Sequence, residues 1–447
     1  MSSAGLPPGP PLPRWAQTAG FILFPVPFVD ACRRRYGDIV TFRSLFDPCF
    51  VMVFSPELVK QVFRGSPDRL RAGEANALLA PIVGNRSVLL LDGAEHLRQR
   101  KLLLPPFHGE RMRAYEQVML EAADRAIDSW PADDDGSEFT LLSSMQALTL
   151  EVIERAVFGV DDGERRAELT ERVRALLDPV TSRRQVLLLV LTGGRRGAGA
   201  GKQFLEARRR LDELLFAEIA HRRRQPDLAE REDVLSMLLH AGAARSDTGE
   251  REEPMTDAEL RDELLTLLVA GHETTATGLA WAFELLMRNP RVLRTLRASL
   301  DEGDTAYLDA VIKETLRLRP VISGVGRKVR EEPFELGGYM MPVGIEINPS
   351  IAAIHRRADS YPEPGEFRPE RHLAAGAPDG YTWLPFGGGT RRCLGASFAN
   401  FEMRVVIRRV LERTELVPAA KPETGVRRGI VFVPRNGVRV RARSVVS

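Results

Sequence analysis

The chain has 447 residues, of which 44% are hydrophobic and 28% are charged. This composition is ordinary for a folded protein and supplies enough apolar material for a large core. The formal net charge of +2, from 63 basic and 61 acidic residues, provides no overall field that would favour nucleic acid as a partner. The three cysteines are scattered and show neither a disulfide framework nor paired metal spacing. We therefore expect a reduced, cytoplasmic protein.

The N-terminal segment is rich in proline. Residues 1–18 are expected to form a stiff, extended arm, and residues 19–447 a single domain, because no Gly/Ser linker or internal repeat divides them. No signal peptide is evident, and the apolar stretch 19–29 contains two prolines and is far shorter than the ~20 residues of a membrane span. We expect a monomer without a transmembrane segment.

A small sheet and a helix are expected next. Residues 39–42 and 50–54 alternate as strands do, and Asp47-Pro48 marks a turn between them. Ser55 is a typical N-cap for a helix at residues 56–63, which begins with proline.

A long loop and a series of helices follow. Residues 71–91 have no clear period and predict a loop of the kind that often carries function. A basic helix then begins near Glu95, with His96 and Arg100 on one face, and alone it would be a solvated basic surface. Further helices are expected at residues 112–130, 141–158 and 165–177. The apolar run 186–191, with a glycine-rich mobile connection to Gly201, would line a pocket roof or access channel, or else be buried in the core.

The longest expected helix begins with a capping box at Thr256 and Glu259 and ends before Pro290. At 1.5 Å per residue it is about 50 Å long. Its middle contains the small residues Ala270 and Gly271, followed by an acid and a hydroxyl, Glu273 and Thr274. A mid-helix glycine costs about 1 kcal/mol, and a threonine can bond back to the carbonyl four residues earlier. This turn is therefore either adapted to accept water or dioxygen or packed through its small residues.

Two further motifs lie nearer the C-terminus. Glu314 and Arg317 are three residues apart on one expected helix face and can pair. Such a pair alone is usually a surface ion pair contributing less than ~1 kcal/mol. Strand-like residues occur at 338–347 and 430–433 and would complete a minor sheet.

A glycine-rich loop presents Cys393 at the start of an apolar helix expected from Leu394 to Glu412. Backbone N–H groups and the helix dipole stabilise a thiolate there, and Gly387, Gly388 and Gly389 permit the close approach of a flat ligand. The string F-x-x-G-x-R-x-C-x-G resembles the haem-ligating loop of the cytochrome P-450 family. Its fixed positions are all filled, by Phe386, Gly389, Arg391, Cys393 and Gly395.

The resemblance runs from about Gly9 to the C-terminus with the motifs in the family's order. It implies a mainly α fold with small β-sheets, the family's α-rich triangular haem domain. Cys393 would ligate the iron of haem b (iron protoporphyrin IX). The other residues that the resemblance places at the cofactor are His96, Arg100, Ala270, Gly271, Arg327, Phe386, Arg391 and Gly395, with His96 and the three arginines holding its two propionates.

The family pattern also assigns roles to two polar groups. Glu273 and Thr274 match the oxygen-activating acid and threonine that relay and position protons for O2 cleavage. Glu314, Arg317 and Arg371 match a buried network beneath the cysteine loop, which would be costly to break.

The implied reaction inserts one oxygen atom from O2 into a C–H bond, by hydroxylation or epoxidation. The substrate would be an apolar small molecule such as a fatty acid, terpene, steroid or polyketide. Its pocket is expected to be lined by Leu78, Leu79, Ile82, Val83, Val269, Val321, Ile322 and Val431.

Electrons would come ultimately from NAD(P)H through a ferredoxin or flavodoxin with its reductase, because the chain has no room for a fused redox domain. Such an acidic partner is expected to dock on a basic patch made of Arg98, Arg100, Lys101, Arg404, Arg408 and Arg409.

Three other classes of protein fit these residues less well. A haem sensor or carrier would not need the acid–threonine pair, and a peroxide-driven relative usually lacks it, so Glu273 and Thr274 count against both. A cysteine hydrolase would need a histidine partner for Cys393, and the histidines of this sequence lie in unrelated contexts.

Overall fold

Helices account for most of the chain, and the β-strands form small sheets. The computed structural model describes residues 5–107, 109, 111–131, 137–159, 163–181, 198–241, 253–373 and 380–444. They fall into two units, the first made of Met1–Leu78, Leu89–Leu97 and Arg288–Ala396, the second of Leu79–Val88, Arg98–Met287 and Ser397–Ser447. Among the described residues, no helix is both long enough and apolar enough to cross a membrane.

The first unit is built around a five-stranded sheet in the order β1-β2-β8-β5-β3. β2 pairs with β8 in parallel, and the other neighbours are antiparallel. Its elements are α1 (Arg14–Leu23), α2 (Pro25–Tyr36), β1 (Ile39–Phe42), β2 (Phe50–Val53), α3 (Pro56–Arg64), β3 (Leu70–Arg71), α4 (Ala72–Ala75), α14 (Pro290–Asp301), α15 (Ala306–Leu318), β5 (Arg327–Val329), β6 (Phe334–Leu336), β7 (Tyr339–Met341), β8 (Glu346–Pro349), α16 (Ile351–Ile354), and the short 3-10 helices η4 (Pro369–His372) and η5 (Gly389–Arg391).

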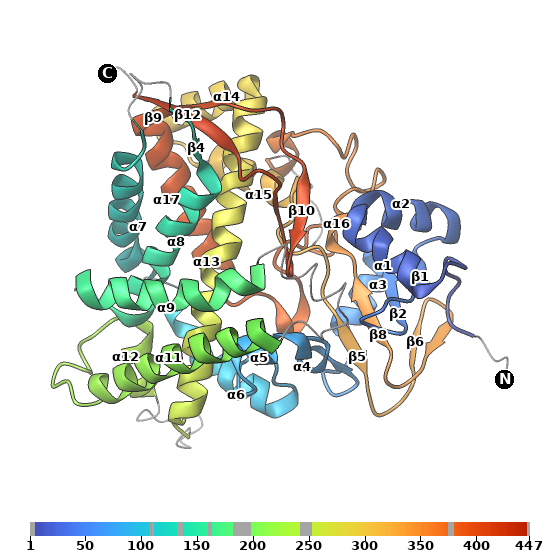
Figure 1. Cartoon of the computed structure of the whole chain (residues 1–447). Helices are drawn as coiled ribbons and strands as arrows, with labels where there is room; N and C mark the ends of the chain where they lie inside the picture. The colour runs from blue at the N-terminus through green and yellow to red at the C-terminus, as the bar shows by residue number, and fades with distance from the viewer. Residues whose placement is uncertain are drawn as a thin grey trace. The chain divides into compact units, whose positions relative to one another are not determined.

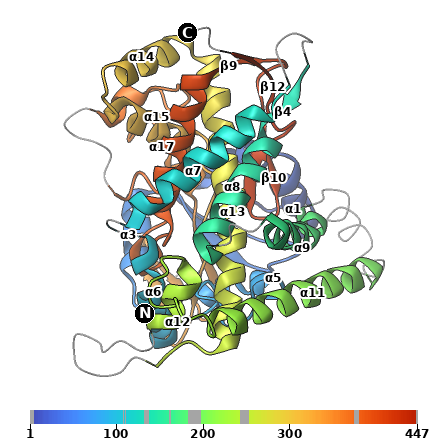
Figure 2. The same ribbon diagram turned by 90° about the vertical axis from the view of Figure 1, so that its left-hand side faces the viewer.

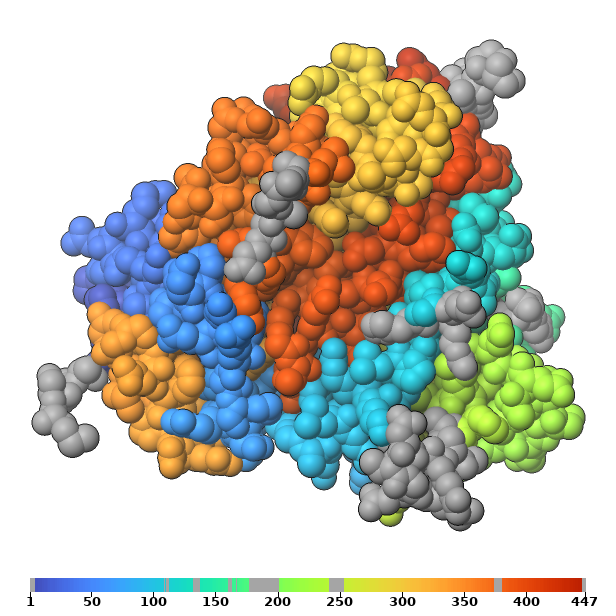
Figure 3. Space-filling view, turned by 180° about the vertical axis from the view of Figure 1, so that it is seen from behind, coloured from blue at the N-terminus to red at the C-terminus, as the bar shows by residue number. Residues whose placement is uncertain are grey.

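β-Branched and aromatic residues fill the strands of this sheet, as pleated surfaces favour. Val51, Val53 and Ile347 are buried against Phe63 of α3, while Phe42 is buried against the helices α1 and α2 (Figure 1). Seen from behind, the blue residues around α3 and β3 lie beside the orange strands that contain β5 and β6, which are far away in sequence (Figure 3).

The N-terminal arm is shorter than predicted. It is extended only as far as Pro13, because α1 begins at Arg14. The carbonyls of Pro7 and Pro8 accept hydrogen bonds from the side chain and backbone of Thr41, at 2.6 and 3.0 Å, so the arm is fixed to β1. Whether residues 19–447 act as one domain stays a prediction.

The second unit is a helical body with two small sheets. α7 packs on α8, and α9 lies beside α11, as the two views agree (Figures 1 and 2). Its elements are α5 (Ala80–Val83), η2 (Pro105–Phe107), α7 (Arg111–Asp128), β4 (Phe139–Thr140), α8 (Leu141–Phe158), α9 (Gly163–Thr181), α11 (Ala198–Arg222), α12 (Val234–Ala241), α13 (Asp257–Arg288), α17 (Ala396–Arg413), β9 (Thr414–Pro418), β10 (Gly425–Arg428), β11 (Val431–Pro434) and β12 (Arg439–Ser444). The boundary between the units falls within α6 (Gly93–Leu103), η1 (Ala77–Leu79) and the ends of α13 and α17.

α13 is the longest described helix and runs beside α8 (Figure 2). Its predicted capping box is present: the Thr256 amide donates to the Glu259 carboxylate at 2.8 Å, and the Glu259 amide donates to the Thr256 hydroxyl at 3.3 Å. The helix ends before Pro290, whose ring cannot continue it.

The first turns of α13 hold the segment that follows α5, which we call the tethered loop, residues 84–88. The backbone amides of Arg86 and Val88 donate to the carboxyl groups of Asp262 and Glu263 at 2.9 and 2.6 Å. The Thr266 hydroxyl donates to the Ser87 hydroxyl at 2.7 Å. This segment was predicted as part of a long loop without structure of its own; instead, short helices occupy residues 72–83 and hydrogen bonds fix the remainder.

Most of the other predicted elements are confirmed. The strands at 39–42 and 50–53 and the Ser55-capped helix are present, and Ser55 accepts from the Leu58 amide at 3.2 Å. The strand-like residues 338–347 and 430–433 do not share one sheet: β7 pairs with β6, β8 joins the large sheet, and β11 pairs with β10. Residues 186–191 lie outside the described residues. The end of the glycine-rich tract was wrongly read as a mobile connection, since α11 begins at Ala198.

Candidate active site

The cysteine loop is folded tightly onto α3 in the first unit. Gly387 and Gly389 have φ values of +67° and +66°, a region that other residues rarely adopt. A Cβ atom added to Gly389 would lie 2.5 Å from the backbone oxygen of Phe63. The Cys393 amide donates to the Phe386 carbonyl at 2.9 Å and closes the loop, while the Cys393 residue remains exposed. The glycines therefore serve close packing within the protein as well as the conformation of the loop.

Two arginines of the first unit differ in their pairing. Arg391 donates to the carboxylate of Asp92 and to the Leu91 carbonyl. Arg327 is 7% exposed, donates to the Gly326 carbonyl at 2.8 Å and lies over the Phe63 ring at 5.4 Å. Within the residues that the structure describes it forms no ion pair, and burial, followed by the nearby Arg391 charge, lowers the pKa of Arg327 to about 10. A buried guanidinium of this kind favours an added anion.

The other two predicted propionate ligands are divided between the units. His96 belongs to the first unit and is 3% exposed, whereas Arg100 is half-buried and belongs to the second. The structure therefore brings Arg327 and Arg391 close to each other in the first unit. His96 belongs to the same unit, and Arg100 belongs to the second.

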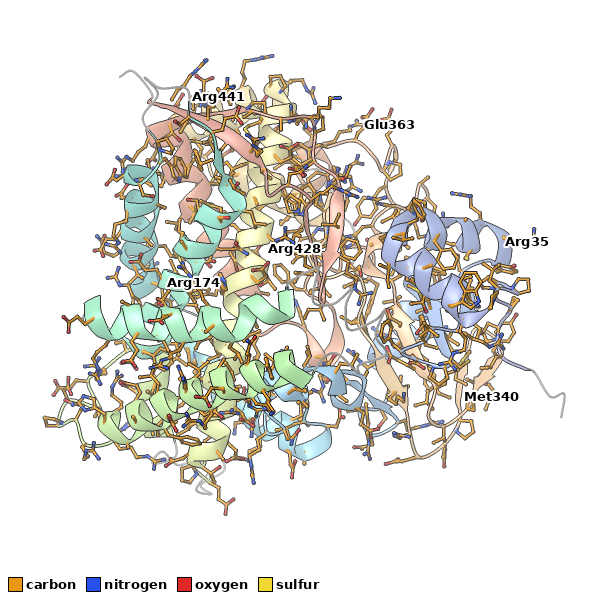
Figure 4. The ribbon with its side chains drawn as sticks, viewed as in Figure 1. Arg35, Arg174, Met340, Glu363, Arg428 and Arg441 are labelled. Atoms are coloured by element: carbon orange, nitrogen blue, oxygen red, sulfur yellow. The ribbon has the colours of Figure 1, made fainter. Side chains whose placement is uncertain are left out.

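The polar turn of α13 lies against α8 in the second unit. The Thr274 hydroxyl donates to the Ala270 carbonyl at 2.5 Å, the back-bond expected from the sequence. The Glu273 carboxyl accepts from the side-chain amide of Gln146 at 2.7 Å. Burial raises the pKa of Glu273, although the Gln146 hydrogen bond and the charge of Arg428, at the end of β10, oppose the shift (Figure 4). Glu273 is thus a carboxyl group that retains its proton more readily than usual.

α8 also contacts the positions immediately before Glu273. A Cβ atom on Gly271 would lie 3.0 Å from Ile153, so Gly271 serves the packing of α13 on α8. Ala270, by contrast, is exposed. The hydroxyl of Thr149 donates to the His272 carbonyl at 2.9 Å. Burial and then the Arg174 charge lower the pKa of His272 to about 4, so this side chain is neutral near pH 7 (Figure 4).

The structure brings together Glu314, Arg317 and Arg371 in the first unit. Arg317 donates to the Glu314 carboxylate from two nitrogens, at 2.7 and 2.9 Å, and Arg371 donates at 3.0 Å. His372 lies 3.0 Å from the same carboxylate, and Arg317 also donates to the carbonyls of His355, Pro364 and Glu366. Glu314 and Arg317 are fully buried, so this network fixes α15 to the segment around η4.

Comparison with known proteins agrees with these motifs. The family model described as Cytochrome P450 matches residues 7–438. The chain belongs to the cytochrome P450 family. A Mycobacterium tuberculosis protein named "Putative cytochrome P450 135B1" is 42% identical, over 99% of this chain and 92% of that relative. A second from the same organism, "Putative cytochrome P450 137", is 40% identical, over 98% and 91%.

Solved structures show the same P450 fold. A retinoic acid-bound cyanobacterial CYP120A1 superimposes with a TM-score of 0.82 at 24% identity, covering 99% of this chain and 100% of that one. The haem domain of cytochrome P450DA gives 0.82 at 22% identity, with 99% of both chains covered. The fold class is therefore confirmed, and the protein is a haem-thiolate monooxygenase, an oxidoreductase that uses haem, O2, redox partners and a small-molecule substrate. Family membership also removes the cysteine-hydrolase alternative.

The residues of this P450 fit a haem on chemical grounds. Haem presents two carboxylates and an iron atom that accepts a soft ligand. Arg327 supplies a buried cation that is not in an ion pair among the described residues, and Cys393 supplies an exposed thiol in a loop of fixed conformation. Asp92 already neutralises part of the Arg391 charge, so Arg327 is the stronger candidate for an unshared propionate contact.

The predicted pocket residues differ in exposure. Val83, Val321 and Val431 are buried at 1, 8 and 5% exposure, whereas Leu78 is 85% exposed. Leu79, Ile82, Val269 and Ile322 are half-buried. The exposed and half-buried members have surface available for a ligand, whereas the three valines already pack in the protein. A pocket role for any of them stays a prediction.

Several polar residues of these sites were not foreseen from sequence. They are Gln146, Thr149, Asp92 and His372, each of which contacts a predicted site residue. Only Asp92 carried a usable signal, because an aspartate before Gly93 is typical of a helix start, where α6 begins. Nothing in the spacing of Gln146 links it to a helix more than a hundred residues later.

Proposed function

We propose that this P450 hydroxylates or epoxidises an apolar small molecule, with Cys393 as the axial ligand of haem b and Arg327 and Arg391 on its propionates. The observation that carries the proposal is the pairing, in one unit, of an exposed thiol on a tightly closed loop with a buried arginine that lacks a carboxylate partner among the described residues. His96 and Arg100 are proposed as additional propionate ligands, and Phe386 and Gly395 as residues that shape the loop around the ring.

When bound, haem with a thiolate ligand supplies the activation of O2, since the thiolate donates electron density that favours O–O cleavage. The chain's own residues supply the protons. Burial raises the pKa of Glu273, so its carboxyl keeps a proton to a higher pH than an exposed carboxyl does. Thr274 supplies the second polar group of the same turn, and its hydroxyl is held by a hydrogen bond to the Ala270 carbonyl. We propose Glu273 as the proton donor and Thr274 as the residue that positions the receiving oxygen or water.

The spectrum of the reduced, carbon monoxide-treated protein tests the ligand assignment. We expect the red-shifted main absorption band of thiolate ligation in the wild type and its loss in Cys393→Ser. Cys49→Ser is the matched control, since Cys49 is a half-buried thiol outside the loop, and should keep the band. A wild type without that band, or a Cys393→Ser variant that retains it, would overturn the proposal.

The substrate class rests on the apolar character of the residues proposed for the pocket, namely Leu78, Leu79, Ile82, Val83, Val269, Val321, Ile322 and Val431. Fatty acids, terpenes, steroids and polyketides fit this chemistry. Spectral titration with a panel of these compounds tests it, because a ligand that displaces the iron-bound water shifts the haem absorption. Shifts given only by small charged compounds would contradict an apolar pocket.

Electrons are proposed to arrive from NAD(P)H through a ferredoxin or flavodoxin and its reductase. The proposed docking surface is less positive than its sequence suggests, because at least three of its six residues have acidic partners within the protein: Arg98 pairs with Glu259, Arg408 with Glu412, and Arg409 with Asp124. Electrostatic docking predicts that the reduction rate falls as salt is added. A rate independent of salt would contradict it. The monomeric state and cytoplasmic location stay predictions.

A further inference from the structure

Exposed apolar side chains gather around α1 in the first unit. Seven of the fifteen large hydrophobic residues that are exposed in the described chain lie between residues 12 and 46, although this stretch is short. They are Leu12, Trp15, Ile22, Leu23, Phe24, Leu45 and Phe46, which we call the N-terminal apolar patch. Trp15, Leu23, Phe24 and Phe46 are each more than 60% exposed. Single exposed apolar residues need no explanation, but a cluster does.

Local contacts explain how these residues come to lie together. The inner face of α1 is bonded to the turn that follows β1: the Gln17 side chain accepts from the Arg43 amide and the Thr18 hydroxyl from the Leu45 amide, both at 2.9 Å. Phe21 packs edge-on against Phe42 at 5.1 Å.

Trp15 and Ile22 lie on the side of α1 next to Thr18, because they are three and four residues away from it in the helix. Because Thr18 bonds the Leu45 amide, the tip of the turn with Leu45 and Phe46 lies beside α1.

The charge around this patch is positive. No acidic residue precedes Asp30 in the chain. Arg14, Arg34, Arg35 and Arg43 are exposed, and in the part of the chain that the structure describes none of the four forms an ion pair; Arg35 lies in the last turn of α2 (Figure 4).

Of the nearby acids, Asp38 pairs with Arg33 and Arg357, whereas Asp47 accepts only the backbone amide of Cys49, at 3.1 Å, and keeps its charge. Residues 1–47 contain five arginines and three aspartates, so a local excess of positive charge remains although the whole chain is close to neutral.

We propose that the N-terminal apolar patch docks on the surface of an anionic lipid bilayer. Tryptophan, phenylalanine and leucine enter the boundary between headgroups and acyl chains, while flanking arginines contact lipid phosphates. A second copy of the chain is a poorer occupant. A twofold interface would place each patch against itself and bring the same four unpaired arginines together, which like-charge repulsion opposes. The proposal is independent of the chemistry at Cys393.

Co-sedimentation with vesicles tests this docking. The full-length holoprotein is mixed with vesicles of phosphatidylcholine alone or of phosphatidylcholine with phosphatidylglycerol. We expect binding to the mixed vesicles and at least a tenfold weaker partition for the triple variant Trp15→Ser, Phe24→Ser, Phe46→Ser. Arg34→Gln and Arg35→Gln should each weaken binding about fivefold on the mixed vesicles only.

The control is a pair of equally apolar surface residues from the second unit, Leu205→Ser with Phe216→Ser, which are 62 and 41% exposed on α11. This variant should bind as the wild type does. All the altered residues are exposed, so thermal unfolding should be little changed. A wild type that binds neither vesicle, or a control that loses as much binding as the triple variant, overturns the proposal. So does a dimer in sedimentation equilibrium that the triple variant abolishes.

Tryptophan fluorescence gives a second, site-specific readout. Trp15 is 66% exposed, whereas the other three tryptophans, at 130, 281 and 383, are buried or half-buried. Adding mixed vesicles should shift the emission to the blue as Trp15 leaves water, and Trp15→Phe should abolish that shift. A shift that persists in Trp15→Phe would show that another region meets the lipid.

Discussion

Two carboxyl groups of this P450, one fully buried and one half-buried, have pKa values shifted in opposite directions. Glu314 in the first unit is fully buried and surrounded by Arg317, Arg371 and His372. Burial would raise the pKa of Glu314, but hydrogen bonds from His372 and Arg317 and the guanidinium charge lower it to about 2. Glu273 in the second unit accepts a hydrogen bond from the neutral amide of Gln146, and burial raises the pKa of Glu273.

The difference lies in the number and charge of the donors. Two guanidinium groups stabilise the Glu314 carboxylate, so this group stays charged and fixes one part of the fold to another. The amide of Gln146 and the charge of Arg428 do not offset the loss of water around Glu273, so the pKa of this group stays raised and it keeps a proton to a higher pH than an exposed carboxyl does. Burial alone therefore does not decide whether a carboxyl group is structural or chemical.

The largest expected effect follows from neutralising Glu314. Glu314→Gln leaves Arg317 buried without a counter-charge and should lower the free energy of unfolding by about 3–5 kcal/mol, measured by urea denaturation. Glu332→Gln is the control, because the Glu332 side chain is 76% exposed and forms only a surface ion pair with Arg69, at 3.7 Å. This variant should change stability by less than ~0.5 kcal/mol. Near-equal stability of the two variants would contradict a charged Glu314.

The pH dependence of stability is a second test of the charge on Glu314. The pKa of Glu314 is lowered in the folded state to about 2, below its ordinary value of 4.5. Its contribution is therefore present above the unfolded pKa and is lost as the pH falls through the folded one. Thermal unfolding of the wild type should lose more stability between about pH 4.5 and pH 2 than that of Glu314→Gln. Parallel curves would contradict the assignment.

Removing the proton from the second carboxyl should affect chemistry rather than stability. Glu273→Gln should lower the rate of product formation about 100-fold, because the amide cannot deliver a proton. The rate is measured with the first substrate found in the spectral screen and a reconstituted redox system. Glu273→Asp keeps an acid at the position and should recover part of the rate. Equal activity of Glu273→Gln and wild type would remove Glu273 from the mechanism.

Removing one hydrogen-bond donor to Glu314 tests how much that donor contributes to the free energy of unfolding. His372→Ala removes one hydrogen bond of 3.0 Å to the carboxylate and leaves both arginines, so we expect a loss of about 1.5–3 kcal/mol, less than for Glu314→Gln. Chemical denaturation measures it. A loss as large as that of Glu314→Gln would mean that the arginines do not hold the charge.

The smallest expected effect concerns the donor to Glu273. Gln146→Ala removes the amide that lowers the pKa of Glu273, so the pH at which activity declines should move upward and the maximal rate should fall roughly tenfold. Gln117→Ala is the matched control, since Gln117 bonds Glu121 at 2.9 Å on the exposed surface of α7. An unchanged pH profile in Gln146→Ala would show that the contact is structural only.

Much of the fold was predictable because its signals are local. The Ser55 cap, the box at Thr256 and Glu259, and Pro290 act within one helical turn, and the structure has helices at each of them. The back-bond of Thr274 was also predictable, because it joins residues four apart. These features depend on spacing that can be counted along the chain.

The partners of the site residues were not predictable in the same way. Gln146 and Glu273 meet because α8 packs on α13, and Asp92 meets Arg391 because the chain returns after nearly three hundred residues. A glutamine in a helix has no pattern that names its distant partner. The extended arm was predicted too long because the prolines end at Pro13, and the helix that starts at Arg14 has no capping side chain to mark it.

The tethered loop has a practical consequence for testing the proposed substrate pocket, to which Ile82 is assigned. Its backbone is secured at Arg86 and Val88 by carboxyl groups of α13, not by the side chain of the nearby Ile82, which is half-buried. Position 82 can therefore be varied in a library while the hydrogen bonds at Arg86 and Val88 are kept. Changes at Asp262 or Glu263 would instead release the whole segment, and libraries should leave those two acids untouched.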